Sequence, residues 1–218
     1  MNVEFLTVGP LESNGFVLWD GEECVLIDPG DEASTFKEFL LTHHLAPSAI
    51  LITHGHVDHI GAVGDLRKEF PACKVYCHSL DAPMLTDPLK NLAGLMGQNL
   101  NVGEPDELLE DGQVLQFGGI RLEVRHVPGH TPGHVVFLHE EEGVFAGDTL
   151  FAGGIGRSDF PGGNAETLLS SIRDKLLNLP DFTPVHPGHG PSTTIGQERH
   201  SNPFLQEGDY FSGADFFG

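Results

Sequence analysis

Short apolar runs alternate along this chain with amphipathic stretches and with turns rich in glycine and proline. Period-two alternation predicts strands, whereas apolar residues at three- and four-residue spacing predict helices. A hairpin is predicted near the start, with strands at 16–19 and 24–28 around the turn Asp20-Gly21. Further strands are predicted at 49–53, 74–77, 114–117, 120–124, 135–138 and 144–146. Helices are predicted at 34–45, 61–70 and 165–179, the last with Asn164 as its N-cap.

Strands come first, a helix follows and the pattern then repeats, which predicts an α+β fold of two sheets covered by helices. A length of 218 residues suits one domain, so we expect residues 1–218 to form a single unit.

Two segments lack a clear pattern. Residues 86–109 are expected to form a loop with a short helix at about 89–96. Its apolar side chains, with Met84 just before it, could line a substrate cleft, but core or loop packing is the preferred interpretation for Met84, Leu92, Leu95 and Met96. The tail from about residue 200 could pack on the domain, cover an interface or extend freely; its aromatic residues are Phe204, Phe211, Phe216 and Phe217.

The most informative polar run is His54-Gly55-His56-Val57-Asp58-His59, directly behind the apolar run at 49–53. In an extended segment side chains alternate between faces, so His54, His56 and Asp58 would project to one side and His59 would be offset. Imidazole and carboxylate groups are ligands that suit zinc, iron or manganese. So many ligands in one short run predict two metal ions that share a pocket.

Three later turns could supply the remaining ligands. They are the segments 126–134, with His130 at its centre, 147–149, with Asp148, and 186–191, with His189. Glycine and proline preset the backbone of each turn, so a side chain is held there at a fixed angle at the edge of a sheet.

In this order, His-x-His-x-Asp-His, Gly-His, Gly-Asp-Thr and Gly-His-Gly resemble the motifs of the metallo-β-lactamase superfamily. Within it the chain resembles the glyoxalase II-like hydroxyacylglutathione hydrolases of the short, single-domain bacterial type. The resemblance implies a four-layer αββα sandwich with the metal site at one edge of the two sheets. It also implies a ligand set: His54, His56 and His130 for one metal, Asp58, His59 and His189 for the other, and Asp148 as a bridge between them.

The resemblance further implies a reaction in which a hydroxide bridging two divalent metal ions attacks a carbonyl group. Zinc is the preferred metal, with iron or manganese as alternatives, and Asp58 and Asp148 are the catalytic carboxylates beside the hydroxide. The segments Gly-His-Thr-Pro-Gly-His (129–134) and Gly-Arg-Ser-Asp (156–159) favour a thioester such as S-(2-hydroxyacyl)glutathione, cleaved to glutathione and a 2-hydroxy acid. Full-length relatives hold glutathione with a helical C-terminal domain, which is not expected here because the chain stops soon after His189.

Three alternative functions stay open. A mononuclear iron persulfide dioxygenase would use His54, His130 and Asp148 as its iron ligands. A lactonase or another hydrolase of the same fold would share the metal site but not the substrate. A non-catalytic metal-binding module would keep the ligands without turnover.

Four further residues are candidates for supporting the ligands or contacting the substrate. Asp28, at the end of a predicted strand, is expected to form hydrogen bonds within the site loops. His134 is expected to orient a ligand or to touch the substrate. Arg157 could form an ion pair with Asp159 or meet an anionic substrate.

Charge and composition limit the classes of molecule that the protein is expected to bind. With 32 acidic and 11 basic residues, the formal net charge of -21 opposes binding to nucleic acid or to an anionic membrane. No long apolar stretch and no signal-peptide pattern occurs, so a cytoplasmic location is expected. The cysteines Cys24, Cys73 and Cys77 are expected to be buried, reduced thiols. The sequence does not fix the oligomeric state.

Overall fold

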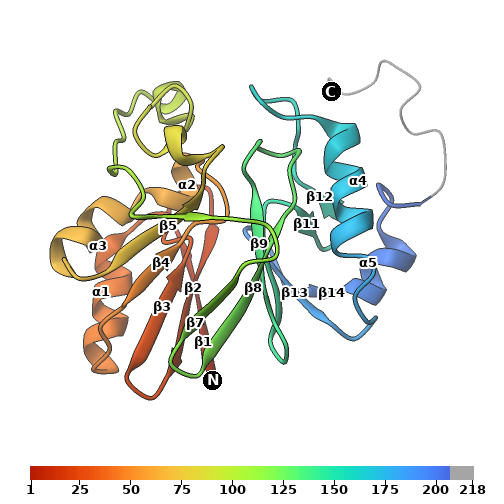
Figure 1. Ribbon diagram of the computed structural model, residues 1–218. Helices are drawn as coiled ribbons and strands as arrows, with labels where there is room; N and C mark the ends of the chain where they lie inside the picture. The colour runs from red at the N-terminus through yellow and green to blue at the C-terminus, as the bar shows by residue number, and fades with distance from the viewer. Residues whose placement is uncertain (207–218) are drawn as a thin grey trace.

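Two six-stranded sheets face each other in the computed structural model, which describes residues 1–206 (Figure 1). The first sheet runs in chain order: β1 (Asn2–Val8), β2 (Ser13–Asp20), β3 (Glu23–Ile27), β4 (Ala49–Leu51), β5 (Lys74–His78) and β6 (Glu107–Leu109). The second has the order β14 (Thr193–Thr194), β13 (Pro184–Pro187), β10 (Gly143–Gly147), β9 (Val135–His139), β8 (Ile120–His126) and β7 (Val114–Phe117). A small separate hairpin consists of β11 (Leu150–Phe151) and β12 (Gly154–Ile155).

Helices cover the outer face of each sheet (Figure 1). On the first sheet lie α1 (Ala33–Thr42) and α3 (Val63–Glu69), preceded by the single turn α2 (Val57–Ile60). On the second lie α4 (Ala165–Lys175) and α5 (Ile195–Ser201). The segment between β5 and β6 contains the short 3-10 helices η1 (Ala82–Met84) and η2 (Ala93–Met96).

Alternation along the strands explains the four layers. In β2, Val17 faces the helices of the first sheet while its neighbour Leu18 faces the second sheet. In β9, Val136 packs under α4 and α5 while Phe137 belongs to the layer between the sheets. Because strands with both faces buried need apolar residues at every position, these runs are nearly continuous in the sequence. The expected αββα sandwich is confirmed.

Sheet topology gathers four strand ends at one edge. Strands β10 and β13 are parallel, and β8 and β10 have the same direction because each is antiparallel to β9. The carboxyl ends of these strands therefore meet, and the loop after β4 of the facing sheet joins them there.

The predicted hairpin, the other predicted strands and the N-cap of α4 agree with the structure, but β13 was not predicted and several boundaries were wrong. The first helix ends at Thr42 rather than 45, since His44 adopts a positive φ of 56° that a helix cannot contain. The helices predicted at 61–70 and 165–179 are shorter, and the edge strands β1, β6 and β14 were not predicted.

The segment 86–109 differs from its prediction in its apolar side chains. Met84 is buried and Leu92 half-buried, as expected for packing, but Leu95 and Met96 are 74% and 44% exposed. Packing was therefore the wrong interpretation for these two, because η2 lies on the surface rather than on the core. In the tail, Phe204 packs against the helices of the second sheet, while Phe211, Phe216 and Phe217 lie outside the described residues.

All three cysteines are free and buried, in line with the prediction. Burial raises the pKa of the Cys24 and Cys73 thiols to about 12. Between residues 1 and 206, no helix is both long and apolar enough to cross a membrane.

Candidate metal centre

The run 54–59 does not continue β4 as an extended segment. The strand ends at Leu51, and a helical turn begins at Val57, so Asp58 and His59 are helical rather than extended. The prediction that the side chains alternate along this run was therefore wrong. A carboxylate is favoured in the first turn of a helix, where backbone N–H groups are unpaired, and this turn carries both Asp58 and His59.

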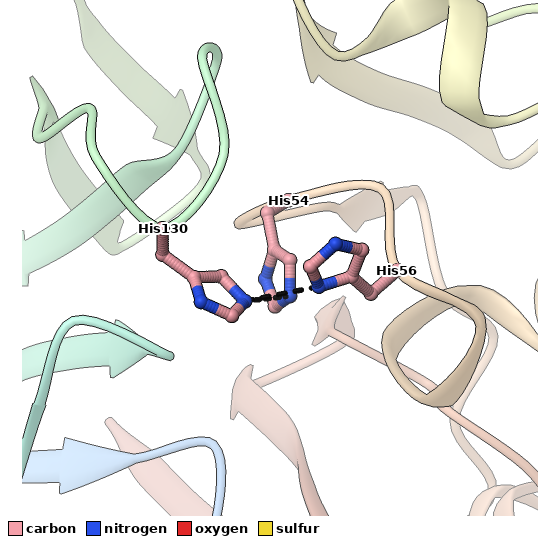
Figure 2. A group of neighbouring side chains, drawn as sticks. All are labelled: His54, His56 and His130. Carbon is pink, nitrogen blue, oxygen red and sulfur yellow. Dashed lines mark hydrogen bonds between the residues drawn. The ribbon is translucent and has the colours of Figure 1, made fainter. Parts of the chain in front are cut away.

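His54, His56 and His130 form one cluster, which we call the three-histidine group (Figure 2). His130 Nε2 lies 3.2 Å from His54 Nε2 and 2.9 Å from His56 Nδ1. Burial and the neighbouring imidazoles lower the pKa of His54 well below its usual value and that of His56 to about 3. His54 and His56 are therefore neutral at physiological pH, with nitrogen lone pairs available.

Hydrogen bonds on the opposite ring nitrogens fix these lone pairs. His130 Nδ1 lies 2.6 Å from the carbonyl oxygen of Arg157, which can only accept, so the neutral ring carries its proton on Nδ1 and leaves Nε2 free. The Thr53 hydroxyl donates to Asp28 and accepts from His54 Nδ1 at 3.1 Å, which likewise leaves His54 Nε2 unprotonated. Lone pairs at this spacing repel one another unless a cation lies between them. Tetrahedral zinc, with bonds of about 2.0–2.1 Å, would hold its nitrogen ligands roughly 3.3 Å apart.

Asp58, His59 and His189 form a second cluster, here called the mixed group. Asp58 Oδ2 lies 3.7 Å from His59 Nε2 and 3.1 Å from His189 Nε2. His59 Nδ1 donates to Asp28 Oδ2 at 2.9 Å, and His189 Nδ1 donates to the carbonyl oxygen of Leu11 at 3.0 Å. Both rings therefore direct their Nε2 atoms towards a carboxylate.

Asp148 lies between the two groups. Its Oδ1 is 3.4 Å from His59 Nε2 and 3.7 Å from His189 Nε2, while its Oδ2 is 3.6 Å from His130 Nε2. Asp148 Oδ1 and His59 Nε2 are buried without a hydrogen-bond partner among the described residues. A divalent cation in the mixed group would satisfy both atoms, and a second cation in the three-histidine group would meet Asp148 Oδ2, so the residues present fit a pair of metals.

In the protein without metal, the two groups differ in charge. Burial alone would lower the pKa of His59 and His189, but Asp58 and Asp148 raise both above the usual range. Burial would raise the pKa of Asp148, and the surrounding histidines, led by His59, lower it instead. The mixed group thus attracts positive charge, whereas His54 and His56 offer neutral nitrogen ligands.

Asp28 is linked by hydrogen bonds to both groups, directly to His59 and through Thr53 to His54. Its carboxylate accepts from the backbone N–H of Thr53 at 2.7 Å and from the Thr53 hydroxyl at 2.5 Å, besides His59. The structure also gathers Asp28, His54 and His59 as a possible ligand set, but His59 Nδ1 already donates to Asp28. We therefore assign Asp28 to hydrogen bonding, in line with its prediction.

His134 contacts the bridging residue. Its Nε2 accepts from the backbone N–H of Asp148 at 3.0 Å, and its ring stacks on His54 with centroids 4.8 Å apart. This buried ring therefore contacts both the backbone of Asp148 and the ring of His54.

Arg157 and Asp159 form an exposed ion pair at 2.8 Å, and the Arg157 guanidinium lies 4.0 Å over the ring of Phe160. Of the two predicted roles for Arg157, the structure shows the ion pair. The contribution of Arg157 to the metal centre is its carbonyl oxygen on His130.

Sequence reasoning missed two polar side chains at the centre. Asn14 donates to the carbonyl oxygens of Pro187 and Gly190 at 3.0 and 2.9 Å, which fixes the turn that carries His189. Asp81 is fully buried and accepts three hydrogen bonds from the loops around His54 and His130. Neither lies in a motif, so no signal in the sequence distinguishes them from ordinary turn residues.

The αββα sandwich, with histidines and aspartates clustered at one edge of its sheets, places this chain in the class of metallo-hydrolases. The chain belongs to the metallo-β-lactamase superfamily, whose sequence model matches residues 8–189.

Relatives within the superfamily carry different functional names. The chain is 42% identical to the hydroxyacylglutathione hydrolase GloC of Haemophilus influenzae, over 94% of this chain and 98% of that protein. The crystal structure of the BLEG-1 B3 metallo-beta-lactamase superposes with a TM-score of 0.89 at 41% identity, over 94% of this chain and 99% of that one. The structure of TTHA1623 in a di-iron-bound form gives a TM-score of 0.84 at 44% identity, over 93% and 100%. The family and the ligand clusters together indicate divalent metals, and iron occurs in one of these relatives.

Proposed function

We propose that this protein is a binuclear metal-dependent hydrolase that cleaves a thioester such as S-(2-hydroxyacyl)glutathione to glutathione and a 2-hydroxy acid. The observation that carries the binuclear part is the position of Asp148, whose two carboxylate oxygens face two separate ligand groups. The similarity to a hydroxyacylglutathione hydrolase over nearly the whole of both chains supports the substrate class.

Each ligand has a definite part in this proposal. The three-histidine group would hold one cation, the mixed group the other, and Asp148 both. Two divalent cations, when bound, would lower the pKa of a shared water from near 16 towards about 7 and so supply an attacking hydroxide at neutral pH. The cysteines lie in the buried core beneath α1 and α3, so no thiol nucleophile takes part.

The protein's own hydrogen bonds keep the ligands in the right protonation state. Asp28 and the Leu11 carbonyl hold the protons of His59 and His189 on Nδ1, leaving Nε2 for the cation. Asp58 and Asp148, whose pKa values the adjacent histidines lower, are ionised at neutral pH and offer no proton. A thioester suits such a site, because a thiol of pKa about 8.5 can leave as the thiolate without a proton donor.

A small, open surface cleft lies beside Asp58. Leu11 and Met96 contribute apolar side chains to its walls, while Gln98 and Asp31 contribute polar ones. We place the non-reacting part of the substrate there, because this cleft reaches the carboxylate of the mixed group.

The test compares substrates on metal-loaded protein. We expect hydrolysis of S-lactoylglutathione to exceed that of a β-lactam or a lactone, without oxygen uptake on glutathione persulfide. Asp58→Ala, His130→Ala and His189→Ala should each lower thioester turnover by orders of magnitude while the circular dichroism spectrum stays unchanged. The control is His200→Ala, an exposed histidine of α5 outside the centre, which should keep full turnover.

Other outcomes would overturn the proposal in distinct ways. Preferred β-lactam or lactone cleavage would replace the substrate class but keep the hydrolase. One iron per chain with oxygen uptake on glutathione persulfide and no thioester cleavage would identify a dioxygenase. Absence of every activity in metal-replete protein would indicate a non-catalytic metal-binding module.

A further inference from the structure

Asp81 lies between β5 and η1, outside every ligand motif, yet its carboxylate is fully buried. Asp81 Oδ2 accepts from the backbone N–H of Gly55 at 3.1 Å and from the Thr131 hydroxyl at 2.6 Å. Asp81 Oδ1 accepts from the backbone N–H of Gly133 at 2.6 Å. One buried carboxylate thus binds two loops that are far apart in the sequence.

Both loops carry ligands of the three-histidine group. Gly55 lies between His54 and His56, and Thr131 directly follows His130. We infer that Asp81 is a positioning residue that clamps these two loops together and thereby sets the spacing of the three imidazoles. The inference rests on the proposed function, because it assumes that the three-histidine group holds a metal.

Close packing around Asp81 supports the clamp. A Cβ added at Gly133 would lie 2.6 Å from the backbone nitrogen of Asp81, and one at Gly55 would lie 2.5 Å from Cβ of Met84. Such contacts are too short for real atoms, so glycine is needed at both positions for the loops to reach the segment that carries Asp81. Since neither loop has room to shift inward, the carboxylate fixes their separation.

This arrangement needs a hydrogen-bond acceptor at both Oδ1 and Oδ2 of residue 81. In Asp81→Asn one oxygen becomes an NH2 group, which can only donate. In one orientation it faces the N–H of Gly133, and in the other it faces the N–H of Gly55, so one loop loses its bond and gains a donor–donor contact. The amide has nearly the shape of the carboxylate, so this substitution changes hydrogen bonding without opening a cavity.

The mixed group does not depend on Asp81. His59 is oriented by Asp28, and His189 by the carbonyl oxygen of Leu11. Loss of the clamp should therefore lower the affinity for one of the two metal equivalents and leave the affinity for the other unchanged.

The experiment measures zinc binding by titration and elemental analysis of the folded protein. We expect Asp81→Asn to lower the affinity of one equivalent at least tenfold, as is typical when a group that orients metal ligands is changed, and to leave the other unchanged. In an Asp58→Ala background, where only the three-histidine group is complete, Asp81→Asn should remove most of the remaining zinc at limiting concentration.

Glu198→Gln is the matched control. Glu198 is equally buried and accepts from Thr193 Oγ1, Gly153 N and Asn202 Nδ2, but none of these residues adjoins a metal ligand. We expect a similar loss of thermal stability in both variants and a loss of zinc affinity in Asp81→Asn alone. A second variant, Thr131→Val, removes one donor to Asp81 and should lower the affinity of the same equivalent by a smaller factor.

Wild-type affinity at both equivalents in Asp81→Asn would overturn the inference, and so would an equal loss of zinc in Glu198→Gln. If Asp81→Asn does not fold, Thr131→Val decides: a weakened equivalent supports the clamp, and unchanged zinc binding contradicts it. A wild-type protein that binds fewer than two metals would contradict the proposed function itself, which separates that failure from the failure of the clamp.

Discussion

Three candidate ligand histidines form a hydrogen bond through one ring nitrogen and present the other ring nitrogen to the metal centre. A carbonyl oxygen does this for His130 and His189, and a carboxylate does it for His59. Because the partner fixes both the tautomer and the ring angle, the ligands are preorganised before any cation arrives.

Asp28→Asn should therefore weaken the binding of a cation by the mixed group. The single amide oxygen can accept either from the Thr53 backbone N–H or from the Thr53 hydroxyl together with His59, and the NH2 group then opposes a donor on the other side. We expect the affinity of that equivalent for zinc to fall by about 10- to 100-fold in a calorimetric titration. Asp106→Asn, a partly exposed carboxylate next to Val75 and Arg67, is the control and should bind zinc like the wild type. Equal affinities in all three proteins would contradict the assigned role of Asp28.

Proton release should distinguish the two metal equivalents. In the metal-free protein Asp58 and Asp148 raise the pKa values of His59 and His189, so a cation must displace protons that these rings hold more readily than a free imidazole does. The pKa values of His54 and His56 are lowered, so no proton competes there. Lowering the pH from about 8 to about 6 should therefore weaken binding at the mixed group, through His59 and His189, more steeply than at the group that contains His54 and His56. Titrations in buffers of different ionisation enthalpy measure the protons released, and identical pH dependence of both equivalents would contradict this assignment.

The strands bring the ligands to one edge, and the sequence predicts most of these strands. Alternation identified the hairpin β2–β3 and the strands β5 and β7 to β10, because their buried faces need apolar residues. Alternation failed for β1, whose residues are mostly exposed or half-buried, and for β11, β12 and β14, which are only two residues long. It also could not show that Asp58 and His59 begin a helix, since four residues are too few for a period to be seen.

The N-cap of α4 provides a test of local structure. The Asn164 side chain accepts from the backbone N–H of Thr167 at 2.8 Å and satisfies a donor that the helix leaves unpaired. Asn164→Ala should lower the free energy of unfolding by about 1 kcal/mol in chemical denaturation. Ser170→Ala, at an exposed position within the same helix, should change it by less than about 0.5 kcal/mol. Equal effects of the two changes would show that the cap is not formed in solution.

For the site, the resemblance of the motifs led to all seven ligand candidates, and the structure brings them together. The groups that orient them were only partly predictable. Asp28 and His134 lie beside motifs, but the carbonyl oxygens of Leu11 and Arg157 belong to the backbone and leave no trace in the sequence. Asp81 is visible only once the fold places two distant loops around it.

The formal charge of -21 predicts a response of the entire fold to salt. Excess like charge destabilises a compact chain by self-repulsion, and dissolved ions screen that repulsion. Raising sodium chloride from about 10 mM to about 500 mM should therefore raise the midpoint of thermal unfolding. Differential scanning calorimetry of metal-free protein measures the shift without a contribution from metal binding. A midpoint that stays constant or falls would show that the acidic residues are already compensated.

The central claim is that two divalent metals share Asp148, and elemental analysis of protein reloaded with excess zinc and then dialysed tests it most directly. The account predicts close to two metals per chain for the wild type and for His200→Ala, and a clear loss for Asp148→Ala, because both groups lose a ligand at once. One metal per chain in the wild type, or an unchanged content in Asp148→Ala, would contradict the account.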